Sequence, residues 1–206
     1  SNIDFDKVKD VSPDIDPGPL PSHLMQVPGF VGEVIEYTLS VAPRPNLPMA
    51  FSAAIALQAT LAGRRVVDGC GVRTNLLMLA VAPSGSGKDA GRQTNRRILE
   101  AAGLHYLEGP EDLASDSGLV NAVEEQPVVL LQLDEIGRML RTTGDARRAP
   151  HLFNIVTVLI RLYSTSSTSY QGKAYAETNR RKRIVYPCLT VYGTTVPEHL
   201  FGGLSL

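Results

Sequence analysis

Apolar and polar positions along the chain change their spacing several times, and each change marks a predicted element. Between Gly29 and Val41, apolar residues recur every three or four positions, which predicts an amphipathic helix. The proline-rich break at residues 43–48 ends this helix, because proline cannot continue one. A second helix is expected over about Pro48–Gly63, and its Ala- and Leu-rich sequence is apolar on nearly every face. That pattern predicts a buried helix.

Longer apolar runs predict buried strands at Leu76–Val81, Val128–Leu133 and Cys188–Tyr192. The unbroken apolar character of 128–133 is typical of a central parallel strand covered on both faces. A further short strand is expected at Leu104–Leu107. Helices are predicted between the strands over Asp89–Ala102, over Ser115–Glu125 with Ser115 as N-cap, and over His151–Tyr163. The order of elements predicts an α/β fold with a mainly parallel sheet.

Two shorter pairs of segments flank turns. Residues 64–67 and 72–75 lie on either side of DGCG, and they predict a short hairpin or the approach to the central strand. Tyr170–Thr178 and Arg183–Tyr186 flank the basic loop NRRKR and predict an antiparallel β-hairpin. That hairpin would be an insertion in the parallel sheet.

Composition predicts one domain with an appended arm. The 206 residues are 43% hydrophobic, enough to bury a substantial core. Residues 1–28 are acidic and then proline-rich, so they are expected to form a linker or wrapping arm rather than part of the core. A terminal tail has the same composition, and both interpretations stay open. The domain is expected over residues 29–206.

Charge and cysteine content narrow the partners and the compartment. The net charge of −1 and the pI near 6.4 exclude a globally basic surface, so contact with nucleic acid requires a local patch. Cys70 and Cys188 have no CxxC partner and are expected to be ordinary thiols in a reducing compartment. No run is long and apolar enough to predict a membrane span. We therefore expect a cytoplasmic protein without a membrane partner. The scattered histidines are expected to be ordinary surface or capping residues.

The stretch NLLMLAVAPSGSGKDAGR, residues 75–92, has the layout of a phosphate-binding loop: a strand, a glycine-rich turn and a helix start. The loop residues predicted to bind the nucleotide are Ser84, Gly85, Ser86, Gly87, Lys88 and Asp89. Their backbone N–H groups would surround an oligophosphate, and Lys88 would reach the β- and γ-phosphates. Two positions depart from the usual pattern: Ala82 replaces the first glycine, and Asp89 replaces the hydroxyl residue that binds Mg²⁺.

The second half of the predicted site is the run VVLLQLDE. An acid at the carboxyl end of a buried strand can bind Mg²⁺, and a carboxylate next to it can polarise the attacking water. Asp134 is therefore assigned to the metal and Glu135 to general base. Two solvated acids after a strand are common by themselves, but their pairing with SGSGK favours a nucleotide site.

Two further features leave two interpretations each. Thr194, at the end of CLTVYGTT, either senses the γ-phosphate and orients the water or is simply a β-branched strand residue. The basic run on the hairpin either grips the phosphates of single-stranded DNA or is a solvated loop. Its members are Arg180, Arg181, Lys182 and Arg183.

The chain resembles the helicase-like ATPase module of phage, prophage and plasmid replication proteins, which often follows a primase–polymerase domain. The residues that carry the likeness are PGFVGEVIEYTLSVAPRPNLPMAFSAAIALQATLAGRRV, LAVAPSGSGKDAGR, LEGPEDLASDSGLVNAV, VVLLQLDEIGRML and RIVYPCLTVYGTTVPEHL. The resemblance implies a RecA-like P-loop core over residues 72–206, preceded by a helical pair at 29–66. It also implies ATP and Mg²⁺ as cofactors, action as a homo-oligomer in DNA replication, and a primase-like domain upstream.

By position, the resemblance assigns phosphate binding to Gly87 and Lys88, the metal to Asp134 and the base to Glu135. Related families carry GKD in this loop, so Asp89 would hold Mg²⁺ or one of its waters. Further strands beyond Leu206 are expected to complete such a core.

Three functions follow as hypotheses. The first is an oligomeric, DNA-dependent ATPase or helicase motor. The second is a degenerate nucleotide-binding module that assists assembly without turnover, which Ala82 and Asp89 favour. The third is a small-molecule kinase. The acidic pair and the basic hairpin argue against this third function.

Overall fold

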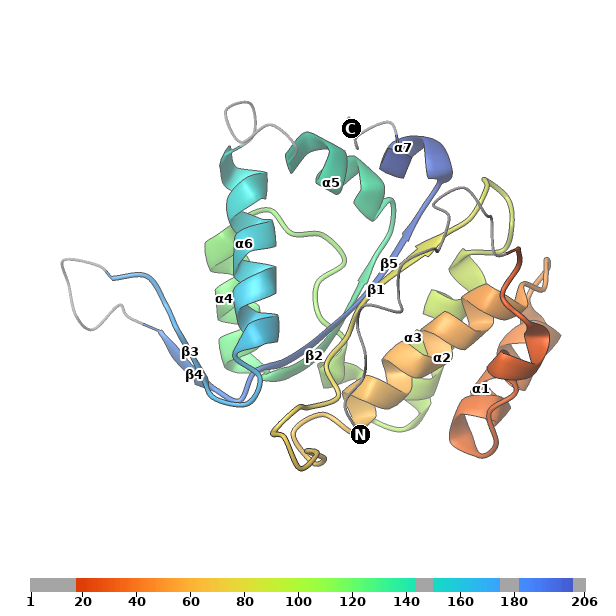
Figure 1. Ribbon diagram of the computed structural model, residues 1–206, viewed down its shortest axis with the longest axis horizontal. Helices are drawn as coiled ribbons and strands as arrows, with labels where there is room; N and C mark the ends of the chain where they lie inside the picture. The colour runs from red at the N-terminus through yellow and green to blue at the C-terminus, as the bar shows by residue number, and fades with distance from the viewer. Residues whose placement is uncertain (1–17, 144–149, 175–181, 202–206) are drawn as a thin grey trace, which may run out of the picture.

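The computed structural model describes residues 18–143, 150–174 and 182–201, and its centre is a small parallel β-sheet with helices on both faces (Figure 1). The strands are β1 (Leu77–Val81), β2 (Val128–Leu133) and β5 (Cys188–Thr195), in the order β1-β5-β2. Both pairings are parallel. The predicted α/β class with a parallel sheet is confirmed.

The central strand is β5 rather than the predicted 128–133 segment. Every residue of β5 is buried, and it pairs with β1 on one side and β2 on the other. Strand β2 is also largely buried, but among the described residues its second edge has only an isolated bridge, where Gly109 N–H donates to Leu130 O at 2.9 Å. Both faces of β2 are apolar because helices cover both of them. An edge strand can be covered in this way as well as a central strand.

Helices α1 (Phe30–Val41), α2 (Leu47–Leu61) and α3 (Asp89–Ala101) cover one face of the sheet (Figure 1). Helix α2 packs against α1, α3 and all three strands, which explains why its sequence is apolar all round. Its small side chains, such as Ala53 and Ala54, are almost completely buried and allow this close approach. The Asn46 side chain caps α2 by accepting from Met49 N–H at 3.2 Å. The predicted helical pair is confirmed.

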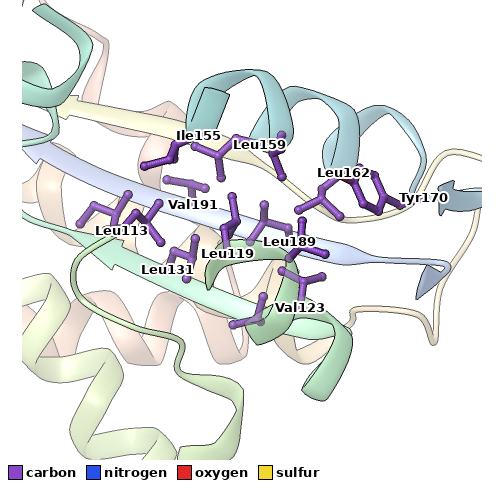
Figure 2. Packing of buried hydrophobic residues seen from close by; sticks show 14 of the residues in the cluster. Leu113, Leu119, Val123, Leu131, Ile155, Leu159, Leu162, Tyr170, Leu189 and Val191 are labelled. Atoms are coloured by element: carbon purple, nitrogen blue, oxygen red, sulfur yellow. The ribbon is translucent and has the colours of Figure 1, made fainter. Parts of the chain in front are cut away.

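The opposite face carries α4 (Asp116–Glu125) and α6 (Pro150–Ser164). Their apolar side chains interdigitate with those of β2 and β5 (Figure 2), among them Leu119, Leu131, Ile155, Leu189 and Val191. Ser115 caps α4 as predicted, since its Oγ accepts from Gly118 N–H at 3.0 Å. Each helix thus buries one stripe against the sheet.

Two short helices that the sequence did not indicate follow directly after strands. Helix α5 (Ile136–Thr143) begins after β2, and α7 (Pro197–Phe201) begins after β5. They contact each other above the same edge of the sheet (Figure 1). Within the predicted N-terminal arm, residues 18–28 include the 3₁₀-helix η2 (Ser22–Met25), whose Met25 is buried, whereas residues 1–17 lie outside the described part.

The predicted strand at Leu104–Leu107 is wrong. These residues lead into the 3₁₀-helix η3 (His105–Leu107), because the chain turns sharply at the end of α3. Gly103 adopts φ +68°, and Leu104 N–H donates back to Leu99 O at 2.7 Å. This glycine-dependent C-terminal motif reverses the chain before an extended segment can form.

The two predicted hairpins have different outcomes. No strand is assigned at 64–67 or 72–75; the Asp68 carboxylate instead accepts from Cys70 N–H at 2.8 Å and Val72 N–H at 2.7 Å, forming a turn that approaches β1. Strands β3 (Ser169–Gln171) and β4 (Arg183–Val185) do pair in antiparallel fashion, as predicted. Residues 175–181 between them lie outside the described part.

Among the described residues, no helix is long and apolar enough to cross a bilayer.

Candidate functional site

The carboxyl ends of the three parallel strands meet at one edge of the sheet. In register, Val81 at the end of β1 lies opposite Thr195 in β5, and Leu133 at the end of β2 lies opposite Gly193. Each strand is followed at once by a segment that the sequence singled out or by one of the short helices. In open parallel sheets this edge is where ligands bind.

Residues 82–88 form the loop between β1 and α3. Gly85 and Gly87 adopt φ values of +71° and +83°, the left-handed region that glycine enters without strain. Within the described chain, the backbone N–H groups of Ser84, Gly85, Gly87 and Lys88 donate no hydrogen bond to protein. These free donors are followed directly by the N-terminus of α3, and such an arrangement of N–H groups can bind an anion.

The turn between α1 and α2 packs directly onto this loop. Arg44 Nη1 donates to Gly85 O at 2.5 Å, and Asn46 Nδ2 donates to Ser86 O at 3.1 Å. A Cβ atom on Gly87 would lie 2.1 Å from Arg44 O, so only glycine fits there. Arg44 and Asn46 are site residues that the sequence did not indicate, because they lie some 40 positions before the loop.

Across the edge, Glu135 is held by two partners. Its Oε1 accepts from Lys88 Nζ at 2.6 Å, and its Oε2 lies 2.7 Å from His199 Nδ1. The pKa of the Glu135 carboxyl lies below its ordinary value because of the hydrogen bond from Lys88 and, second, that from His199. The carboxylate is therefore ionised near neutral pH, and His199 Nδ1 is the donor. The structure thus brings together the predicted phosphate lysine and the predicted base.

Asp134 lies beside them in a separate set of contacts. It accepts a hydrogen bond from Thr194 Oγ1 at 2.9 Å and forms an ion pair with Arg92 Nη2 at 3.0 Å. The same Arg92 nitrogen lies 2.8 Å from Asp89 Oδ1, so both predicted metal ligands share one guanidinium. Thr194 is completely buried and contacts Asp134 rather than open space.

The donor set fits a magnesium ion that also binds phosphate. Among the described residues there is no group of three or more His, Cys, Asp or Glu side chains placed to hold a metal by themselves. Mg²⁺ commonly takes only one or two protein carboxylates and completes its shell with waters and substrate phosphates. Asp134 and Asp89 can supply the carboxylates. Ser86 Oγ, in the loop between β1 and α3, is buried and has no hydrogen-bond partner in the described part of the chain, so a bound ligand could satisfy it.

A cavity of about 340 Å³ gives access to this edge from the β2 side. It lies next to α3 and α5, and its lining includes Arg92, Asp134, Glu135, Arg138 and Met139. Both acids therefore face a space that admits solvent, as a water-activating carboxylate requires.

The predicted DNA-contacting residues are not part of this edge. Lys182 and Arg183 lie by β4, which precedes the amino end of β5, and Lys182 pairs with Glu124 of α4. Arg180 and Arg181 lie outside the described residues. The hairpin projects from the far end of the sheet relative to α5 and α7 (Figure 1).

His199 is the site residue most at odds with the sequence analysis, which predicted an ordinary surface or capping histidine. It lies 64 positions after its partner Glu135. The only sequence signal was its position just after the GTT end of a buried strand.

No protein-family model, curated protein or solved structure matches the chain.

Proposed function

We propose that this chain binds ATP with Mg²⁺ at the carboxyl edge of its sheet and hydrolyses it, acting as the motor module of a phage- or plasmid-type DNA replication protein. One observation carries the catalytic part of the proposal. The Lys88 ammonium lies 2.6 Å from the Glu135 carboxylate, at the end of a loop in which four backbone N–H groups have no partner among the described residues. The phosphate-binding and water-activating groups are thus adjacent.

The strand order supports a RecA-like P-loop core. Strand β5 lies between β1, which leads into the phosphate loop, and β2, which ends in the acidic pair. An extra strand between these two motif strands is typical of ATPases that use a glutamate as base. The polar residue Thr194 at the end of the intervening strand contacts Asp134, which ties the strand to the acidic pair.

The chain's residues divide the work of hydrolysis. The N–H groups of Ser84, Gly85, Gly87 and Lys88 bind the β- and γ-phosphates together with the Lys88 ammonium, which draws this ammonium away from Glu135. Glu135 then accepts a proton from a water molecule whose oxygen attacks the γ-phosphorus. The bond from that phosphorus to the bridging oxygen breaks, giving ADP and phosphate. Asp134 and Asp89 would hold Mg²⁺, which would supply positive charge against the phosphate oxygens.

A second candidate is a module that binds nucleotide without turning it over. The observation that favours it is the pairing of Arg92 with both Asp134 and Asp89, which a metal would have to displace. The DNA role rests on the sequence resemblance and on the basic hairpin, and homo-oligomeric action rests on the resemblance.

Binding is tested by titrating the chain with ATP and MgCl₂ in a calorimeter. The wild type should bind, and Lys88→Met should weaken binding by at least about tenfold, because a charged hydrogen bond to phosphate is worth roughly 1.5–3 kcal/mol. Glu125 is an exposed residue at the C-terminal end of α4. Glu125→Gln is the surface control and should bind ATP like the wild type. Equal binding by wild type and Lys88→Met would contradict the proposed site.

The motor role is tested by measuring ATP hydrolysis with and without single-stranded DNA, which should raise the turnover rate if the chain is a motor.

A further inference from the structure

We infer that His199 is the positioning residue of Glu135, keeping this base in place when the nucleotide takes its other partner. The inference rests on the proposed function and adds a residue to it. In the structure each oxygen of the Glu135 carboxylate has its own partner, Lys88 at Oε1 and His199 at Oε2. Only the first of these is a group that phosphate binding would remove.

The direction of the histidine hydrogen bond follows from its neighbours. His199 Nδ1 lies 2.7 Å from the Glu135 carboxylate and 3.4 Å from Arg138 Nε. A ring nitrogen that donates to a carboxylate cannot at the same time accept from a guanidinium. The shorter, charge-assisted contact determines the tautomer, so Nδ1 carries the proton and donates to Glu135.

The backbone around both residues holds this geometry. Glu135 adopts φ +50°, a conformation that a residue with a Cβ atom adopts only when its surroundings impose it. Its N–H donates to Asp134 Oδ1 at 2.9 Å. On the other side, Gly137 of α5 packs so closely on α7 that a Cβ atom there would lie 3.2 Å from the His199 carbonyl carbon. The histidine is therefore anchored to the segment that carries the base.

These contacts assign His199 a task at the moment of reaction. When Lys88 turns to the phosphates, Glu135 Oε1 becomes free to accept a proton from water. His199 remains on Oε2 and prevents the carboxylate from rotating away. Thr194, near the end of β5, donates to Asp134, and α7, which follows β5, carries His199. The end of one strand therefore orients both neighbouring acids, Asp134 and Glu135.

A purely structural role for His199 would look different. Its side chain is 27% exposed, and a single hydrogen bond makes only a modest contribution to stability. Its removal should therefore change the rate of the chemical step more than the free energy of unfolding. A misplaced reacting group can lower a rate by about 100-fold, so an effect on kcat of about 10- to 100-fold is expected.

The test compares kcat, KM and the Kd for ATP in the wild type, His199→Ala, His199→Asn and His151→Ala, with thermal melting as a check on folding. Asparagine places an amide nitrogen close to the position of the histidine Nδ1 and can replace the donor, whereas alanine cannot. His151, an exposed histidine in the first turn of α6, is the matched control. If His199→Ala melts below the assay temperature, His199→Gln, whose amide lies one carbon farther out, takes its place.

We expect His199→Ala to lose about 10- to 100-fold in kcat with the Kd for ATP changed by less than about twofold. His199→Asn should recover much of the loss, and His151→Ala should match the wild type. A wild-type kcat in His199→Ala, an equal loss in the asparagine variant, or a loss confined to KM would overturn the inference and leave the proposed function standing. Absence of turnover in the wild type would overturn both.

Discussion

Lys88 Nζ and Glu135 Oε1 lie 2.6 Å apart, so the predicted phosphate-binding lysine and the predicted base neutralise each other across the edge of the sheet. The Lys88 side chain is only 11% exposed and that of Glu135 30% exposed, which limits screening of the pair by solvent. In the proposed mechanism a nucleotide therefore competes with Glu135 for the Lys88 ammonium. Phosphate binding would then free the Glu135 carboxylate in the same step.

The first prediction concerns acid stability. Because the folded-state pKa of Glu135 lies below its ordinary value of 4.5, the carboxylate stabilises the fold above that pH and loses this effect as pH falls through the folded pKa. Glu135→Gln should lower the free energy of unfolding at neutral pH and converge with the wild type in the acid range below 4.5. Lys88→Met should behave in the same way, since it removes the main cause of the shift. Urea unfolding across this range measures the difference, and a gap that does not change with pH would refute it.

The second prediction separates backbone strain from close packing. Gly87 and Gly103 adopt φ values of +83° and +68°, but a Cβ atom at Gly87 would lie 2.1 Å from Arg44 O, whereas one at Gly103 would meet nothing within 4 Å. Gly103→Ala should lower the free energy of unfolding by about 1–2 kcal/mol through strain alone. Gly87→Ala should cost a further 1–3 kcal/mol or so, because the α1–α2 turn must move. Equal losses in denaturant unfolding would show that this turn does not press on the loop.

The third prediction tests the link between the helical pair and the phosphate loop. Asn46 caps α2 through its oxygen and donates to Ser86 O through its nitrogen. Asn46→Ser keeps a capping oxygen but loses the amide nitrogen that donates to Ser86 O, so it should weaken ATP binding with little change in stability. Asn46→Ala should also lose about 1 kcal/mol of stability. Calorimetric titration of both variants, beside the cap variant Ser115→Ala, measures the two effects. An unchanged Kd in both would remove Asn46 from the site.

Several of these elements were predictable because their signals are local. The spacing of apolar residues located α1, and the alanine-rich run located α2. Glycines and an apolar run located the loop between β1 and α3, and a serine before a helical pattern located the α4 cap. In each case the residues that determine the element lie within a short stretch of sequence.

The features that sequence analysis missed depend on distant contacts. His199 meets Glu135 only because α7 and α5 follow neighbouring strands of one sheet, and Arg44 meets Gly85 only because α2 lies on α3. Leu104–Leu107 has strand-like residues, but Gly103 and the hydrogen bond to Leu99 turn them into a 3₁₀-helix. The choice of β5 as the central strand likewise follows from register, which no single apolar run encodes.

The fourth prediction uses two buried threonines of β5. Thr194 Oγ1 donates to Asp134, whereas Thr190 Oγ1 is buried and has no hydrogen-bond partner among the described residues. Thr194→Val should raise the Mg²⁺ concentration needed for half-maximal ATP hydrolysis by about tenfold or more, since groups that orient a metal ligand have effects of this size. Thr190→Val should leave the Mg²⁺ requirement unchanged. The Mg²⁺ dependence of turnover measures both, and identical curves for Thr194→Val and wild type would contradict the role given to Asp134.

The most direct test of the central claim is the steady-state rate of phosphate release from ATP and Mg²⁺ by the wild type and by Glu135→Gln. The amide keeps the size of the side chain but cannot accept the proton from water. We expect turnover by the wild type, a loss of about 100-fold or more in Glu135→Gln, and retained ATP binding in that variant. Phosphate release at the same rate in both proteins would contradict the assignment of Glu135 as the base, and no release by the wild type would contradict hydrolysis itself.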